Sequence, residues 1–368
     1  MIRLLLVILL VTGCTPRGVM TLDPSAAGVG VTRTVFVGTT RAVRAATGRF
    51  DGDRSEAVAF ARYDVSIPPE REMGEITWPK KGQKPNALTD FVAVGEVIYP
   101  DDAPFRSALS QAMARDRRDG REAVIFVHGF NNTFSEGLYR IAQLSNDLDM
   151  PGVTVHYSWP SAGKPLGYVE DRDSALFARD GLEQLINEVS QAGADRIVLV
   201  AHSMGAMLTV EAIRQIAIRG DRRLMGKLSG VILISPDIDV DVFRTQAHAI
   251  GTLPDPFVIF GSNRDRVLDL SARITGQPDR LGNMTDVSKV ADLKVTYLDT
   301  AAFAEGAGHF TVATSPALLN LLSRIAEVDA AFDADRTGRT GLLPGVVLTV
   351  RSATRIILSP VAEIARGF

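Results

Sequence analysis

Cysteine is almost missing from this sequence, because its 368 residues contain a single one, at position 14. One cysteine cannot close a disulfide within the chain, so no disulfide framework stabilises the fold. A dominant charge is missing too, since 40 lysines and arginines accompany 43 aspartates and glutamates and give a formal net charge of −3. This balance, without clusters of Lys and Arg, argues against nucleic acid as a partner.

Long apolar runs and metal-ligand clusters are missing as well. The apolar run Leu4–Val11 is far shorter than the ~20 residues that span a bilayer. No group of His, Cys, Asp and Glu residues has the spacing of a metal site. No glycine-rich loop has the spacing that binds a nucleotide. We therefore expect neither a metal nor another cofactor.

The N-terminus predicts a secretory leader at residues 1–13. Arg3 precedes the apolar run, and small residues then lead to Cys14, which is the order of a signal peptide. The stretch Val11–Cys14 resembles the lipobox of bacterial lipoproteins, which implies cleavage before Cys14 and its acylation; an ordinary signal with an incidental cysteine is the alternative. Thr15, rather than Asp, follows the cysteine. The resemblance therefore implies a lipid anchor in the bacterial cell envelope, with the periplasmic face of the outer membrane favoured.

Composition divides the remaining chain into four parts. Residues 14–32 are rich in Gly, Pro, Ala and Thr and predict a tether. Residues 33–105 predict a small β-rich region packed on the main domain at 106–335, and residues 336–368 form an apolar, amphipathic tail. We expect this tail to dock on the core of the domain rather than to lie on a membrane. The strand-like runs of the β-rich region are Thr34–Val37, Phe60–Ile67, Glu75–Trp78 and Phe91–Tyr99.

The main domain alternates short apolar runs with longer helical stretches. Such strands are typical of a mainly parallel sheet that is covered by helices on both faces. Right-handed crossovers place the C-terminal ends of these strands on one edge, where ligands bind. The expected strands are Ala123–Val127, Val153–Tyr157, Arg196–Ala201, Gly230–Ile234, Phe257–Phe260 and Leu293–Leu298. The expected helices cover 134–148, 171–192, 204–219, 240–250, 266–275 and 316–331.

The segment Val198–Ala206 carries the strongest functional signal. An apolar strand leads into Ala-His-Ser-Met-Gly, and a helical pattern follows. This order is typical of the nucleophile elbow of α/β-hydrolases, in which a serine on a strained turn projects above the sheet. The turn requires small neighbours, which Ala201 and Gly205 supply. We therefore identify Ser203 as the candidate nucleophile.

A serine hydroxyl needs a base and an acid that orients the base. Among five histidines, His309 is the best candidate, because it lies in a glycine-rich loop after the last apolar strand. Asp265, which follows the strand before it, is the favoured acid, since the order Ser, Asp, His is that of this fold. Asp237 and Asp239, which follow the preceding strand, remain alternative acids.

The oxyanion hole needs two backbone N–H donors. The residue after the nucleophile, Met204, supplies the first, and the helix that begins there adds favourable dipole charge. The loop after the strand Ala123–Val127 supplies the second in this fold. We assign this donor to Phe130, with Asn131 as the alternative, and expect the imidazole of His128 to have a structural role beneath this loop.

Several separate motifs resemble a bacterial α/β-hydrolase family of unknown function. They are Phe126–Asn132, Tyr157–Ser161, Ala201–Gly205 and Ser235–Asp239, together with Thr39–Arg41 and Val65–Pro68. The resemblance covers about residues 34 to 325. It implies an α/β-hydrolase fold and a Ser-Asp-His triad, but it implies no substrate.

The function that these residues predict is the hydrolysis of carboxylic esters through an acyl-enzyme. The expected partner is a small acyl ester, and membrane contact is expected through Cys14. Two alternatives stay open. The same triad would serve an acyltransferase if an alcohol or amine replaced water, and a catalytically silent fold would serve as an envelope-binding lipoprotein.

Overall fold

The structure is a computed structural model, and it describes residues 17–45, 48–79, 83–115, 120–276, 279–303, 308–309, 311–322, 345–350 and 353–358. The expected leader, Cys14 and much of the C-terminal tail lie outside these residues. No helix within the described ranges combines the length and apolarity that crossing a membrane requires.

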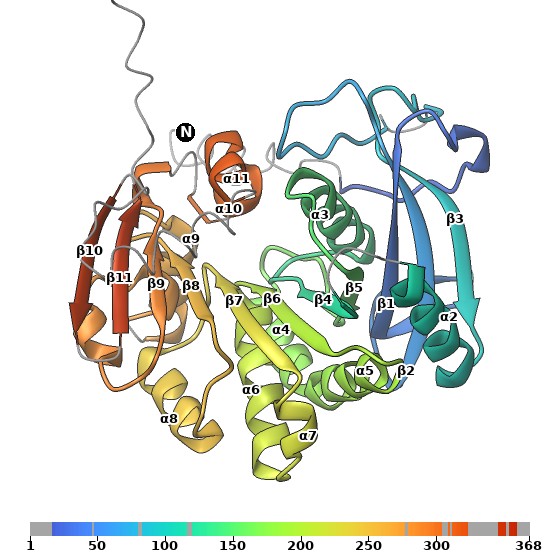
Figure 1. The fold of residues 1–368 in the computed structure, drawn as a ribbon. Helices are drawn as coiled ribbons and strands as arrows, with labels where there is room; N and C mark the ends of the chain where they lie inside the picture. The colour runs from blue at the N-terminus through green and yellow to red at the C-terminus, as the bar shows by residue number, and fades with distance from the viewer. Residues whose placement is uncertain are drawn as a thin grey trace, which may run out of the picture.

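A single mixed sheet organises the described chain (Figure 1). Its strands lie in the order β10-β11-β9-β8-β7-β6-β4-β5-β1-β2-β3, and those from β11 to β1 run parallel. The bounds are β1 (Val31–Arg44), β2 (Arg49–Ile67), β3 (Val92–Tyr99), β4 (Glu122–Val127), β5 (Val153–Ser158), β6 (Arg196–His202), β7 (Leu228–Ile234), β8 (Phe257–Gly261), β9 (Thr296–Asp299), β10 (Gly345–Val350) and β11 (Ala353–Leu358). The expected α/β-hydrolase architecture is confirmed.

Helices cover both faces of the sheet, so the domain has two apolar cores. In Figure 1, α3, α10 and α11 lie above the sheet, and α5, α6 and α8 lie below it. The helices are α2 (Asp102–Arg115), α3 (Phe134–Asp147), α4 (Tyr168–Phe177), α5 (Arg179–Gln191), α6 (Met204–Ile218), α7 (Arg222–Met225), α8 (Val240–Ile250), α9 (Arg266–Thr275), α10 (Thr311–Thr314) and α11 (Pro316–Leu322). Burial on both faces explains why the central strands are apolar throughout.

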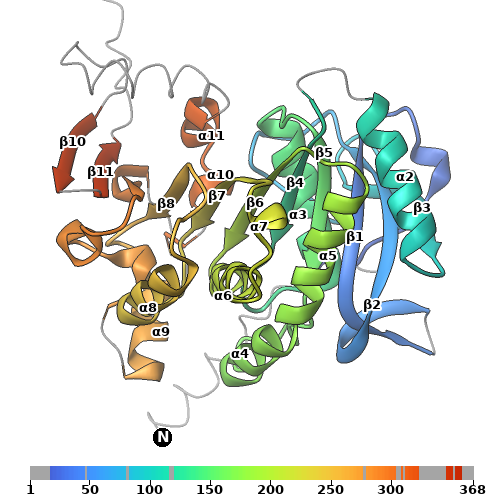
Figure 2. The ribbon, with the colours of Figure 1, turned by 60° about the horizontal axis from the view of Figure 1, so that its bottom comes forward.

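The β-rich N-terminal region joins the main sheet edge to edge. β1 pairs in parallel with β5, with Phe36 opposite Val155, and β2 and β3 follow as antiparallel neighbours. Figure 2 shows α5 lying across β1 and β5. The packing there is close, because a Cβ added at Gly38 of β1 would lie 2.8 Å from Leu185 of α5. The region is therefore part of the domain that holds the candidate nucleophile.

One expected strand is wrong, and three of the described helices, α2, α7 and α10, were not among those expected. Glu75–Trp78 has irregular backbone, and its apolar character reflects side-chain packing, since the ring of Trp78 stacks on Tyr139 of α3 with centroids 4.8 Å apart. α2 covers the start of the main domain and buries Phe105 completely. Expected helices 134–148, 204–219, 240–250 and 266–275 correspond to α3, α6, α8 and α9, whereas 171–192 is divided between α4 and α5.

The described part of the C-terminal tail adds two strands to the far edge of the sheet. β11 pairs in parallel with β9, and β10 forms an antiparallel pair with β11. The described strands of the tail thus extend the domain's own sheet through backbone pairing at its edge. Residues 323–344, which include part of the expected helix 316–331, lie outside the described residues.

Candidate active site

The turn between β6 and α6 holds Ser203 in a strained conformation, with φ 51° and ψ −123°. The N–H of Ser203 donates to the carbonyl of Ile234 at 2.9 Å, which ties the turn to the neighbouring strand β7. A Cβ at Gly205 would lie 2.2 Å from the carbonyl oxygen of His128, so only glycine fits there. Ser203 occupies the N-cap position of α6, yet its hydroxyl makes no capping hydrogen bond. The local geometry is that of a nucleophile elbow.

His309 and Asp265 form a close pair at the same edge of the sheet. The Nδ1 atom of His309 lies 2.8 Å from Oδ2 of Asp265, whose side chain is fully buried. The other carboxylate oxygen of Asp265 accepts from the N–H groups of Val267 and Leu268, both at 3.0 Å, and so caps α9. The helix therefore fixes the carboxylate that holds the imidazole.

The imidazole of His309 also lies beside the elbow. Its ring centroid is 4.8 Å from that of His202, the residue before Ser203. Within the described chain, no hydrogen bond joins the imidazole of His309 to the hydroxyl of Ser203. Catalytic hydrogen bonds are often long without substrate and tighten when it binds. The structure therefore brings the three expected residues to one edge, with the Asp–His contact formed.

The two alternative acids are engaged elsewhere. Oδ1 of Asp237 accepts from the hydroxyl of Ser271 at 2.6 Å, and Oδ2 accepts from the phenol of Tyr168 at 2.8 Å. Arg280 lies 3.4 Å from the same carboxylate. Asp239 accepts from the first turn of α8 as its N-cap. Neither contacts His309 among the described interactions, so the geometry favours Asp265.

The backbone N–H groups of the two candidate donors in the loop after β4 differ in their hydrogen-bond partners. Within the described ranges, the N–H of Phe130 donates to no acceptor, whereas that of Asn131 donates to Asp171 at 3.1 Å. Asn131 is thus the poorer oxyanion donor of the two candidates. On the other side of the site, the N–H of Met204 begins α6 and has no partner within that helix.

The imidazole of His128 supports this loop from below. Its two ring nitrogens lie 2.9 Å and 3.1 Å from the carbonyl oxygens of Gly129 and Trp159. Its ring stacks on the indole of Trp159 with centroids 4.9 Å apart. Burial, with the nearby Arg41 charge, holds the pKa of His128 well below its usual value, so the ring is neutral. This is the structural role that the sequence predicted.

A buried arginine and a buried aspartate fix the loop after β4, the candidate oxyanion loop, from two sides. The guanidinium of Arg41 donates to the carbonyls of Asn132 and Ser161, both at 2.9 Å. Asp171 accepts from the hydroxyl of Ser161 at 2.6 Å and from the N–H of Asn131 at 3.1 Å. Burial lowers the pKa of Arg41 to about 10, so its side chain stays charged at neutral pH.

Sequence reasoning assigned neither residue a role. Arg41 was visible only as the end of the motif Thr39–Arg41, and nothing in the sequence around Asp171 marks it. Each acts through partners that are far away in the chain or lie on another loop. The position of Arg41 on β1 shows that the N-terminal strands help to build the site.

No cluster of metal-ligating side chains exists within the described residues. Two further histidines, His156 and His248, make contacts outside the candidate site. His156 is buried within β5 and binds the carbonyl of Phe126 at 3.1 Å, and His248 pairs on the surface with Asp292 at 3.1 Å.

The fold and the elbow together define the class. A parallel sheet with a strained serine between strand and helix, and an Asp–His pair at the same edge, is an α/β-hydrolase domain. The family model described as "Alpha/beta hydrolase of unknown function (DUF900)" matches residues 103–324. The chain belongs to this family. The matched range begins after β3, so Arg41 lies outside it.

Several solved structures are similar to this chain at low sequence identity. Esterase B from Lactobacillus rhamnosis shares 16% identity over 61% of this chain and 81% of its own, with a TM-score of 0.38. An esterase from Pyrobaculum calidifontis shares 12% over 84% and 89%, with a TM-score of 0.39. Lipase B from Aspergillus fumigatus shares 15% over 61% and 54%, with a TM-score of 0.36. No curated protein matches the sequence.

Stability should fall in mild acid because of buried neutral histidines. Burial lowers the pKa of His156 to about 3 and holds those of His128 and His202 well below their usual value. Below about pH 6.5 the unfolded chain therefore binds more protons than the folded chain. Each ring lowers the free energy of unfolding by up to about 2 kcal/mol between pH 7 and pH 5. In chemical denaturation, the free energy of unfolding of His156→Gln should fall by about 2 kcal/mol less than that of wild type between pH 7 and pH 5. Equal losses would contradict this account.

Arg41→Met should destabilise the domain and disturb its loops. The change leaves the buried carbonyl of Ser161 and the partly buried carbonyl of Asn132 without these donors, at up to about 1–3 kcal/mol each. Arg44→Met is the matched control on the same strand, because Arg44 is 61% exposed and its loss should cost less than about 0.5 kcal/mol. Urea unfolding measures both. Equal stabilities of the two variants would show that Arg41 does not hold the loops.

Proposed function

We propose that this chain hydrolyses carboxylic esters through an acyl-enzyme on Ser203. The hydroxyl oxygen attacks the acyl carbonyl while Nε2 of His309 takes its proton. The N–H groups of Met204 and Phe130 stabilise the tetrahedral oxyanion. His309 then protonates the departing alcohol, and a water that it deprotonates releases the acid and restores the serine.

The contact between His309 and Asp265 carries this proposal. A carboxylate 2.8 Å from Nδ1 selects the tautomer with its proton on Nδ1, which leaves the Nε2 lone pair for the serine. The same carboxylate stabilises the imidazolium that forms during attack. Because Asp265 is fully buried and held by α9, no further free energy is needed to position its carboxylate during the reaction.

The surroundings of Ser203 favour charge that develops on an acyl oxygen. The residue is 2% exposed, and in a site with little water a fixed dipole acts more strongly than in solvent. The N-terminus of α6 begins at the next residue and contributes partial positive charge. Its dipole and the two N–H groups act on the same oxygen.

A fluorophosphonate probe and a short activated ester test the proposal together. Ser203→Ala should lose labelling and turnover while its thermal unfolding stays close to that of wild type. Asp265→Asn should lower turnover by about 10⁴-fold, since it favours the wrong tautomer. Asp237→Asn is the matched control and should keep most of its rate.

Two results would reject these assignments. Full labelling of Ser203→Ala would show that Ser203 is not the nucleophile. A larger loss of turnover for Asp237→Asn than for Asp265→Asn would show that Asp237 is the acid. A competing alcohol in the same assay separates water from other acyl acceptors, because a transferase yields the new ester.

We also propose that an acylated Cys14 anchors the protein in the bacterial envelope. The lipobox-like stretch Val11–Cys14 supports this. Arg17, three residues further on, donates to the side chain and carbonyl of Asn131, both at 2.7 Å. Since three residues span at most about 11 Å, such an anchor would hold the candidate oxyanion loop close to the lipid surface.

Cys14→Ser should move the protein from the detergent phase to the aqueous phase when the expressing cells are extracted with Triton X-114. The physical reason is that the variant lacks the acyl chains that give membrane affinity. Wild type and variant found together in the detergent phase would contradict lipidation at this residue.

A further inference from the structure

A cavity lies at the edge of the sheet opposite the candidate active site. It has a volume of about 610 Å³ and is bounded by the first residues of β1 and β5, by β2 and by α2. β1 and β5 run parallel to β6 through the sheet, so their first residues lie at the edge away from Ser203. The volume is that of a small-molecule site.

The cavity joins an apolar floor to a cationic rim. Phe36 and Val153 are buried in the floor. Three arginines line the cavity, Arg33, Arg62 and Arg115, whereas Asp64 is the single acidic residue of the lining. Arg33 also pairs with Asp149 at 3.6 Å, so one positive charge is in excess, which matches an anion rather than a neutral ligand.

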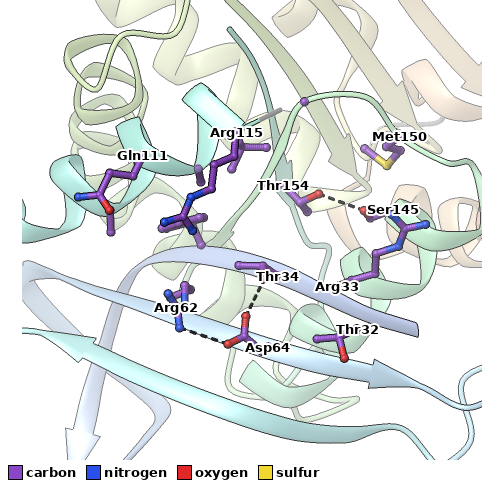
Figure 3. A pocket seen from close by; sticks show the side chains of 15 residues that line it. Thr32, Arg33, Thr34, Arg62, Asp64, Gln111, Arg115, Ser145, Met150 and Thr154 are labelled. Carbon is purple, nitrogen blue, oxygen red and sulfur yellow. Dashed lines mark hydrogen bonds and ion pairs between the residues drawn. The ribbon is translucent and has the colours of Figure 1, made fainter. Parts of the chain in front are cut away.

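The single carboxylate is already used within the wall. Asp64 accepts from Arg62 at 3.2 Å and from the hydroxyl of Thr34 at 2.6 Å (Figure 3). The Nε atom of Arg62 remains buried and meets no acceptor in the described part of the chain. Because that atom is buried, a ligand would reach the outer guanidinium nitrogens of Arg62, whose side chain is 36% exposed.

Arg115 enters the cavity from the other wall. Figure 3 shows its side chain reaching from α2 toward Arg62. Across residues 17–322, as far as they are described, Arg115 has no ion-pair partner. Two guanidinium groups that approach each other repel, unless an anion lies between them. Guanidinium groups bind carboxylate and phosphate oxygens well because their N–H donors form a planar fork.

We propose that this cavity binds a small amphiphilic anion. Its carboxylate or phosphate head lies between Arg62 and Arg115, and its short apolar chain covers Phe36 and Val153. The site is separate from the proposed ester hydrolysis, because it shares no residue with the edge that holds Ser203, Asp265 and His309.

Calorimetric titration with octanoate tests the site, with octyl phosphate, octanol and inorganic phosphate as comparison probes. Wild type should bind one octanoate, and octanol and inorganic phosphate should each bind at least tenfold more weakly. Octyl phosphate binding more tightly than octanoate would assign a phosphate head, and the reverse order a carboxylate head. Arg115→Met and Arg62→Met should each weaken binding at least tenfold. Arg223→Met, on exposed α7, is the matched control and should bind like wild type.

Three outcomes would overturn the proposal. They are no octanoate or octyl phosphate binding by wild type, octanol binding as tightly as octanoate, and unchanged binding by Arg115→Met. The last outcome would place the ligand elsewhere, including the catalytic edge. Thermal unfolding of Arg115→Met checks its fold, and its midpoint should equal that of wild type because Arg115 is exposed.

Discussion

The backbone strain at Ser203 is the constraint on which the site depends. A non-glycine residue with φ 51° and ψ −123° costs about 1–3 kcal/mol, and it persists only where surrounding structure holds it. Here the N–H of Ser203 is bound to Ile234, and its carbonyl accepts from Asp237 at 3.2 Å. Gly205 allows α6 to begin against the carbonyl of His128. The strained turn is thus stabilised by both neighbouring strands.

The polar side chains around Ser203 are also held by the structure that surrounds them. Asp265 both caps α9 and holds His309, so the position of the imidazole follows from where a helix starts. Arg41 and Asp171 fix the opposite loop from β1 and α4. Arg41, Asp171 and Asp265 are buried, and each makes several hydrogen bonds, which is the condition under which a buried polar group is tolerated. Secondary structure thus positions the carboxylate of Asp265 and the loop after β4.

Much of the main domain follows from local sequence. β4, β6, β7 and α6 are marked by apolar runs and helical periods, because burial on two faces leaves a clear pattern. The pairing of β1 with β5 is not marked, since the partner of a strand depends on contacts far apart in the chain. Glu75–Trp78 shows the related error, in which apolar residues pack through their rings without joining the sheet.

The candidate site also contains residues that the local sequence reveals and residues that it does not. Ser203 is visible from its neighbours, because the elbow places steric demands on adjacent residues. The sequence favoured Asp265 but left Asp237 open, since both follow strands at the same edge, and only the coordinates show that their partners differ. Arg41 was beyond prediction because its partners include Asn132, Ser158 and Ser161, all on other segments.

The convergence of hydroxyl, imidazole and N–H donors at one point is most directly tested by a crystal structure of the protein treated with an alkyl phosphonate ester. The account predicts phosphorus bonded to Oγ of Ser203 and Nε2 of His309 within hydrogen-bond distance of a phosphonate oxygen. The other oxygen should accept from Met204 and Phe130. Phosphorus on a different residue, or an adduct at Ser203 with His309 turned away from it, would contradict the account.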